Sequence, residues 1–287
     1  MASIDLGPAR ATDLTRRWRA ALPRANAGFL VLGGVTLVAL VGPLLAPHDP
    51  ADLVGTSFAR PGEDGFLLGS DALGRDLLSR TLHGLRTSWL AALAVVAIGL
   101  LVGGLVGLVA GARGGWVDSV LMRVTDAFLA LPAPVLAIAI VAALGPGLRN
   151  SLLAVSLVWW PFYARVVRGE VRALAGRPHV EAARMAGAGP VRIALVHLLP
   201  GVIPTAVITA TMDLGTLVLT LAGLSFLGLG QPAPAAELGA DSARNMPFLL
   251  QYWWVPVIPG LAVMLLALVG TLAGGSLATS LDRSRRD

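Results

Sequence analysis

The chain has 287 residues, of which 55% are hydrophobic and only 14% are charged, and its mean hydropathy is +0.75. A soluble domain carries about a quarter charged residues, so these values exclude an ordinary soluble enzyme and indicate a polytopic membrane protein. The formal charge of +5 comes from arginines scattered between apolar runs, which is not the basic face of a nucleic-acid-binding protein.

Two residue types are absent, and each absence restricts the chemistry. All 22 basic residues are arginines, whereas a phosphate-binding loop of the form GxxxxGK[ST] needs a lysine. We therefore predict that the chain is not an enzyme and that any ATP hydrolysis takes place on partner subunits. Without cysteine there is no disulfide or thiolate chemistry. The histidines are dispersed and lack metal-site motifs, so neither a metal nor a cofactor is expected: His48, His83, His179 and His197.

The first segment, residues 1–24, is predicted to be cytoplasmic. It carries five arginines, and Leu14, Trp18 and Leu22 recur at helical spacing. This pattern fits a short helix on the inner membrane surface, although disorder is favoured for the first dozen residues. The chain then divides into a first transmembrane helix with an external loop (25–86), a five-helix core (87–277) and a cytoplasmic tail (278–287).

Uncharged runs mark six transmembrane helices, since about 20 residues are needed to cross the hydrocarbon. The fourth is short and contains Pro161, so it is expected to be tilted or kinked. Glycines at four-residue spacing in the second predict close packing against a neighbour: Gly103, Gly107 and Gly111. The predicted spans are Ala25–Pro47, Thr87–Ala112, Ala127–Leu148, Asn150 to about Val167, Val202–Gly223 and Val255–Leu277.

The apolar run Ile193–Ala236 is long enough for two crossings, and positive charge decides between one and two. Arginine-rich short loops stay in the cytoplasm, which places 165–192 inside. One crossing then returns the arginine-rich tail to the inside and leaves Ser225–Trp254 as an external segment. Sixteen of the 22 arginines fall in segments assigned to the inside. We therefore predict an all-α, multi-pass protein of the cell inner membrane with both termini cytoplasmic.

The external loop His48–Arg86 turns amphipathic from Ser70 onward. Leu73, Leu77 and Leu78 share one helical face, and Asp76 and Arg80 have the spacing of an i,i+4 ion pair. This pattern predicts a short helix lying against the outer membrane surface.

The interval from Arg177 to Pro200 reads RPHVEAARMAGAGPVRIALVHLLP and has the composition of a compact helical segment. Pro178 suits a first helical turn, and Glu181 there complements the helix dipole. Gly187 can take the left-handed conformation that ends a helix, and Gly189-Pro190 prevents its continuation. A helix of two to three turns is not stable alone in water, so another surface must hold it.

This interval resembles the EAA loop of membrane subunits of ABC importers, through Glu181-Ala182-Ala183, Gly187 and Leu199-Pro200. The similarity covers roughly Gly33 to Leu277. Further blocks resemble the C-type subunit of the dipeptide/oligopeptide/nickel permease branch: Leu68–Arg80, Gly114–Asp118, Tyr163–Gly169 and Leu224–Gly230.

The resemblance implies an ABC importer type I permease fold and a coupling helix that docks on a cytoplasmic ATPase. Its coupling residues would be Glu181, Ala182, Ala183, Arg184, Gly187, Ala188, Leu199 and Pro200. The implied partners are a second homologous permease subunit, two ATPase subunits, an extracytoplasmic substrate-binding protein and membrane lipid, without nucleic acid. The implied function is half of the translocation pathway of a peptide importer. Alternatives are a permease for nickel, haem or another small solute, or an ATP-independent secondary transporter.

Asp213 is the one carboxylate inside an apolar run, and a charge at membrane depth faces a partner or an aqueous cavity. Two interpretations stay open: Asp213 lines the translocation path and meets a peptide amino group, or it is a paired or protonated packing residue. Relatives often carry a glutamate where this chain has Leu221, which weakens inference from the family's acid. The tryptophans Trp159, Trp160, Trp253 and Trp254 are interpreted as interfacial anchors. Arg165 and Arg168 are interpreted as snorkelling arginines.

Overall fold

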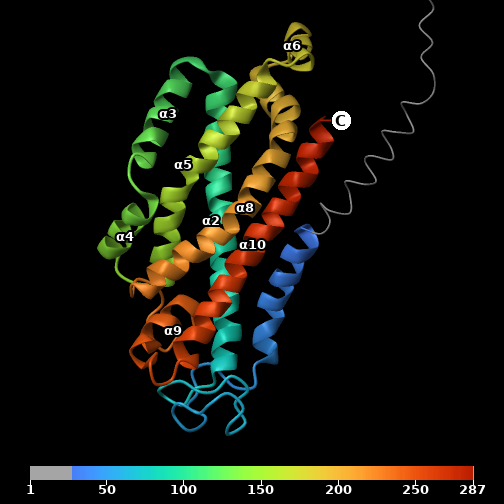
Figure 1. The fold of residues 1–287 in the computed structure, drawn as a ribbon. Coiled ribbons are helices and arrows are strands. Elements are labelled where there is room, and N and C mark those ends of the chain that lie inside the picture. Colours follow the sequence, from blue (N-terminus) through green and yellow to red (C-terminus); the bar gives the residue numbers. More distant parts are fainter. Residues whose placement is uncertain (1–27, 287) are drawn as a thin grey trace, which may run out of the picture.

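The computed structural model describes residues 28–286, and within them the fold is a bundle of long helices without strands (Figure 1). The predicted features of residues 1–24 lie outside the described residues. An apolar helix over residues 28–41 leads into the 3-10 turn η1 (Gly42–Leu45). The remaining elements are α2 (Leu77–Arg113), α3 (Gly115–Leu129), α4 (Ala133–Leu144), α5 (Leu148–Ala175), α6 (Pro178–Met185), α7 (Pro190–Arg192), the π-helical η2 (Ile193–Leu198), α8 (Leu199–Phe226), α9 (Leu238–Asn245), η3 (Met246–Phe248) and α10 (Trp254–Arg286).

The bundle has two distinct ends. The short helix α6 protrudes at one end, and α9 lies with the 46–76 loop at the other (Figure 1). We call these the α6 end and the α9 end. The long helices α2, α5, α8 and α10 run between them, and their apolar faces meet in a core that includes Trp89, Val155 and Leu217.

The six predicted spans correspond to long apolar helices, to one bent pair of helices and to one helix whose apolar run is interrupted. Four helical stretches in residues 28–286 are long and apolar enough to cross a membrane: Gly28–Leu45, Leu77–Arg113, Pro190–Phe226 and Trp254–Ser276. The pair α3–α4 makes a fifth if it is counted as one broken span. The fourth predicted span lies inside α5, a 28-residue helix whose apolar run is interrupted by Arg165 and Arg168. The ambiguous run Ile193–Ala236 contains one long helix, α8, which ends at Phe226; the next helix, α9, begins after the run and is only eight residues long.

The predicted third span, Ala127–Leu148, is wrong in its bounds. The helix α3 already begins at Gly115, and it ends at Leu129, before a break of three residues. The axes of α3 and α4 differ in direction by 82° across this break. Pro132 explains the break, since a proline disfavours helical backbone in the residue before it and cannot donate to the preceding turn.

The predicted short surface helix in the external loop is also wrong. Ser70 and Asp76 form an isolated antiparallel bridge, and Asp76 caps the N-terminus of α2 by accepting from the Leu78 and Ser79 backbone N–H groups. The cap starts one 37-residue helix at Leu77, ten residues before the predicted span. Leu77 and Leu78 therefore belong to the second membrane helix.

Arg80 does not form the predicted pair with Asp76. Its guanidinium is 1% exposed and lies 2.5 Å from the Asp241 carboxylate, and it also donates to the Pro50 carbonyl at 2.6 Å. A buried arginine is tolerable only where its donors are satisfied. Arg80 consequently joins α2, the 46–76 loop and α9 into one assembly at the α9 end.

Glu237 caps the N-terminus of α9 at the same end. Its carboxylate accepts from the Gly239 and Ala240 backbone N–H groups at 3.2 and 3.0 Å, and it is 3% exposed. Burial raises the pKa of the Glu237 carboxyl above its ordinary value, against the hydrogen bonds that lower it. Folding therefore favours the protonated form of Glu237 more than the unfolded chain does.

The predicted glycine ridge is confirmed as a close contact between α2 and α5. A Cβ at Gly103 would lie 2.2 Å from the Trp160 carbonyl oxygen, and one at Gly107 would lie 2.4 Å from that of Ala164. A Cβ at Gly111 would also clash, with the Val171 side chain. Only glycine allows two helices to approach this closely, so the ridge fixes α5 against α2 over about two turns.

Candidate functional site

The helix α6 protrudes from the bundle but is held at one point. Val180 is fully buried and packs in a cluster with Leu174 of α5, Ile193 and Leu198 of η2, and Val202 of α8. Fully burying a valine stabilises the docked helix by roughly 1.5–3 kcal/mol. This contact supplies the outside support that an eight-residue helix requires.

The end of α6 follows the predicted glycine rule. Gly187 has φ = +82°, its N–H donates to the Arg184 carbonyl, and the Ala188 N–H donates to the Ala183 carbonyl, both at 3.0 Å. These two bonds define a Schellman motif with glycine in the left-handed position. The chain then restarts as α7 at Pro190, which gives α6 a sharp stop.

The outward face of α6 carries the residues of the EAA motif. Glu181, Ala182 and Arg184 are exposed, and Met185 is 89% exposed. Ala183 is half-buried and faces the bundle side of the helix. The exposed face is therefore short, low in relief at Ala182, and flanked by one carboxylate and one guanidinium.

The other predicted coupling residues lie apart from this face. Ala188 is half-buried and packs on the cluster around Val180. Leu199 and Pro200 form the first turn of α8, beyond α7 and η2, and Leu199 packs against the same cluster. The structure thus brings Glu181–Ala188 together as one knob and places Leu199-Pro200 at the base that supports it.

Two motifs of the resemblance meet in an ion-pair cluster behind the knob. Asp118 of α3 is 5% exposed and pairs with Arg168 and Arg172 of α5, with 2.7 Å between Arg168 Nη2 and Asp118 Oδ2. About two turns of α3 nearer the break, Asp126 pairs with Arg165 at 2.5 Å, and both side chains are more than half exposed. Arg165 and Arg168, interpreted from the sequence as snorkelling arginines, both bind carboxylates of α3, which the sequence interpretation did not include.

Asp213 combines features of both interpretations left open. Its Oδ2 accepts from Trp159 Nε1 and from the Tyr163 hydroxyl, the latter at 2.9 Å. The half-buried carboxylate also lines a pocket of about 210 Å³ beside the break between α3 and α4. The other lining residues are apolar or aromatic: Leu129, Ala133, Val158, Trp159 and Phe162. A carboxylate beside two aromatic rings can bind a small cationic group.

Trp159 is not an interfacial anchor, because it lies in the interior of α5 and holds Asp213. The sequence interpretation missed that Trp159 and Tyr163 both bind Asp213. Tyr163 is 1% exposed. The available signal was their spacing, since residues four apart share one helical face. Trp254 is also buried, against Tyr252, whereas Trp253 is 58% exposed.

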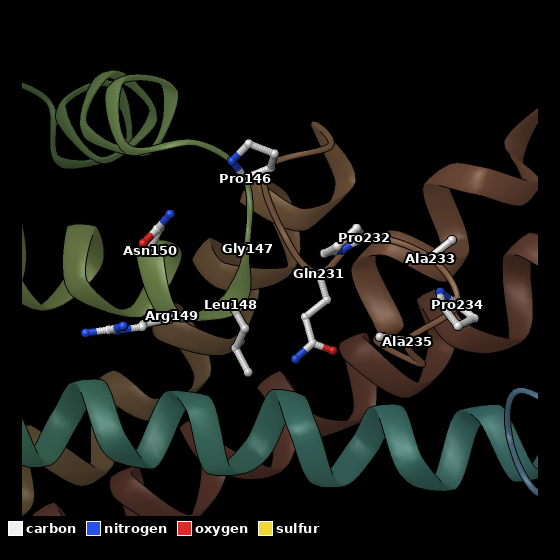
Figure 2. A pocket seen from close by; sticks show the side chains of 10 residues that line it. All are labelled: Pro146, Gly147, Leu148, Arg149, Asn150, Gln231, Pro232, Ala233, Pro234 and Ala235. Atoms are coloured by element: carbon white, nitrogen blue, oxygen red, sulfur yellow. The ribbon is translucent and has the colours of Figure 1, made fainter.

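A larger pocket of about 820 Å³ opens at the α9 end, between the start of α5 and the loop after α8. The two segments face each other across it, and the Arg149 side chain extends away from the opposite loop (Figure 2). Asn150 fixes its α5 side by donating to the Leu144 and Gly145 carbonyls, and Gly147 N–H donates to the Leu229 carbonyl at 3.1 Å. The pocket is lined by Pro146–Asn150 and Gln231–Ala235.

The described residues thus form a helical bundle with a protruding short helix, an ion-pair cluster around the buried Asp118 and a pocket lined by Asp213. Residues 103–287 match the family of binding-protein-dependent transport system inner membrane components. The chain belongs to this family, which makes it a permease component of an ABC importer.

Curated relatives place the chain in the dipeptide/oligopeptide/nickel branch. It is 40% identical over 264 residues to the di/tripeptide transport system permease protein DppC of Pseudomonas aeruginosa (strain UCBPP-PA14), covering 90% of this chain and 87% of the relative. It is 38% identical to the probable D,D-dipeptide transport system permease protein DdpC of Escherichia coli (strain K12), covering 86% of this chain and 83% of the relative. It is 37% identical to the nickel transport system permease protein NikC of the same strain, covering 94% of this chain and 95% of the relative.

The fold also resembles a solved permease. A chain of the MetNI methionine ABC transporter, in inward-facing conformations, superposes with a TM-score of 0.56 at 22% sequence identity. The superposition covers 70% of this chain and 96% of that chain. The type I permease fold predicted from the sequence is therefore confirmed.

Proposed function

We propose that this chain forms one half of the translocation pathway of an ATP-driven peptide importer and that α6 is its contact with an ATPase subunit. The observation that carries this proposal is the geometry of α6: one buried valine attaches the helix, and the EAA residues are exposed. Two dipeptide relatives favour peptides as substrates. Nickel is the second candidate, because a nickel relative matches almost the whole chain.

ATP binding and hydrolysis belong to the partner subunits in this proposal. The chain contains no lysine and hence no standard phosphate-binding loop. Two cytoplasmic ATPases, a second homologous permease subunit and an extracytoplasmic binding protein complete the complex. The α6 end faces the cytoplasm, together with both termini.

Coupling follows from the attachments of α6. The knob continues from α5, which ends at Ala175, and its cluster includes residues of η2 and α8. When the ATPases close on nucleotide, a displacement of α6 moves the ends of α5 and α8. A motor shifts the inward–outward equilibrium only by binding the two states with different free energies, and the exposed face of α6 provides that differential contact.

Asp213 lines the pathway and receives the amino group of the peptide. Trp159 and Tyr163 hold one carboxylate oxygen, and the pocket at the α3–α4 break exposes the side chain to the space between helices. A cationic amine gains from both the carboxylate and the aromatic walls. A peptide with a blocked amino terminus loses this interaction.

The absence of native cysteine permits a direct test by single-cysteine cross-linking. Ala182→Cys places a thiol on the exposed face of α6, and Leu250→Cys, at a residue 98% exposed at the α9 end, is the matched control. In the assembled importer, a short bifunctional reagent should join position 182, but not 250, to the ATPase. In intact cells a membrane-impermeant maleimide should label only position 250. Cross-linking of the ATPase at 250 alone, or labelling of 182 from outside, would refute the assignment.

A further inference from the structure

An apolar trough runs along α2 towards the α6 end. It consists of two adjoining pockets, one of about 360 Å³ between α2 and α8 and one of about 290 Å³ between the end of α2 and α7–η2. The two pockets share Leu105, Leu108 and Leu195, which makes the trough continuous. Every residue that lines the deeper pocket is apolar.

The trough has the length of a lipid chain in one leaflet. Along α2 it extends from Leu101 to Arg113, which is about 18 Å at 1.5 Å per residue. Half of a hydrocarbon core of about 30 Å is about 15 Å. The trough therefore reaches from the membrane surface to about the middle of the bilayer.

Two arginines stand at its surface end. Arg113 is the last residue of α2, Arg184 lies in the last turn of α6, and both line the shallower pocket and are exposed. No acidic residue lines either pocket, and the ion pairs found among the described residues involve neither arginine. Two guanidinium groups beside an apolar trough match an anionic head group attached to a hydrocarbon chain.

The deeper pocket has free space at its centre. A Cβ at Gly104 would meet no atom within 4 Å, in contrast to Gly103 and Gly107, which face α5. Leu101 and Leu105 beside it are exposed to the outside of the bundle. Gly104 thus provides a position where an added side chain would fill the trough without disturbing the protein.

We propose that this trough binds one anionic phospholipid, with its phosphate between Arg113 and Arg184 and an acyl chain along Leu101–Leu108. Charge favours an anionic lipid over the basic segment of this chain that lies outside the described residues. The arginine-rich segment 1–24 would bring like charges to the mouth. The lipid connects α6 to the end of α2, and the proposal uses the proposed function only to assign the leaflet as the inner one.

Native mass spectrometry of the purified full-length chain with added phosphatidylglycerol or phosphatidylcholine tests the site. The wild type should retain phosphatidylglycerol in preference. Removal of each arginine, in Arg113→Gln and Arg184→Gln, should weaken its retention about fivefold. Gly104→Leu should abolish retention by filling the trough. The matched controls are Arg123→Gln, an exposed arginine on α3, and Gly33→Leu, a glycine of the first membrane helix with equally free space; both should bind as the wild type does.

Four results would overturn the proposal. Wild-type retention of the lipid by a variant that carries both Arg113→Gln and Arg184→Gln would exclude the head-group site. Wild-type retention by Gly104→Leu would exclude the trough and leave only attraction to surface charge. Competition by soluble glycerol phosphate as effective as that by the lipid would exclude a role for the acyl chain. Loss of the lipid on assembly of the whole importer would show that a protein segment occupies the trough. Because retention is measured without transport, failure here leaves the proposed function untouched.

Discussion

Replacing Gly187 by leucine isolates the backbone requirement at the end of α6. The residue has φ = +82°, and a Cβ there would meet nothing within 4 Å, so the substitution introduces conformational strain without a steric clash. An L-residue in the left-handed region costs about 1–2 kcal/mol. The burial of Val180 that holds α6 contributes roughly 1.5–3 kcal/mol, so the strain cancels much of it. A change of this size lowers the ratio of docked to undocked α6 by a factor of about 5–30.

The assay is peptide uptake and ATP hydrolysis by the reconstituted importer, measured on the same vesicles. Gly187→Leu should insert normally, keep ATPase activity and raise the ATP consumed per peptide several-fold. Gly189→Leu is the matched control, because Gly189 has φ = −66° and equally free space. Gly187→Asn should recover most of the coupling, since asparagine tolerates the left-handed region. Equal loss of coupling at 187 and 189 would refute the reasoning.

Three further perturbations test other parts of the protein. Asp213→Asn should reduce uptake of peptides with a free amino terminus more than uptake of N-acetylated peptides; an equal reduction in both would assign Asp213 to helix packing. Asp118→Asn should lower the free energy of unfolding in detergent by about 1–2 kcal/mol, because it leaves two arginines without their carboxylate, whereas Asp126→Asn, at an exposed pair, should cost at most about 1 kcal/mol; equal effects would contradict this ranking. Because burial raises the pKa of Glu237, its contribution to stability is complete below the unfolded-state pKa and is lost as the pH rises through the folded-state pKa. Glu237→Gln should therefore flatten the decline of the melting temperature with rising pH, and an unchanged slope would contradict the assignment.

Features that depend on local rules could be predicted from the sequence. The start of α6 at Pro178, its stop at Gly187 and the restart at Pro190 each follow from the backbone preferences of single residues. The glycine ridge of α2 was predictable for the same reason, because its period alone places three glycines on one face.

Features that depend on another helix could not be predicted in this way. Arg80 pairs with a carboxylate 161 residues away, and Asp213 is held by side chains 50 and 54 residues before it. No local spacing encodes such partners. The break between α3 and α4 is a different case, since a search for uncharged runs passes over Pro132, which was the visible signal.

The interlocked backbones of α2 and α5 restrict how this protein can change shape. A sliding motion of one helix along the other would drive the α5 carbonyl oxygens out of the space that Gly103 and Gly107 leave open and against the side chains of neighbouring residues. The two helices must therefore travel as a single rigid lever during alternating access. Flexing is left to the junctions outside that lever, above all the proline-containing corner between α3 and α4 that borders the Asp213 pocket.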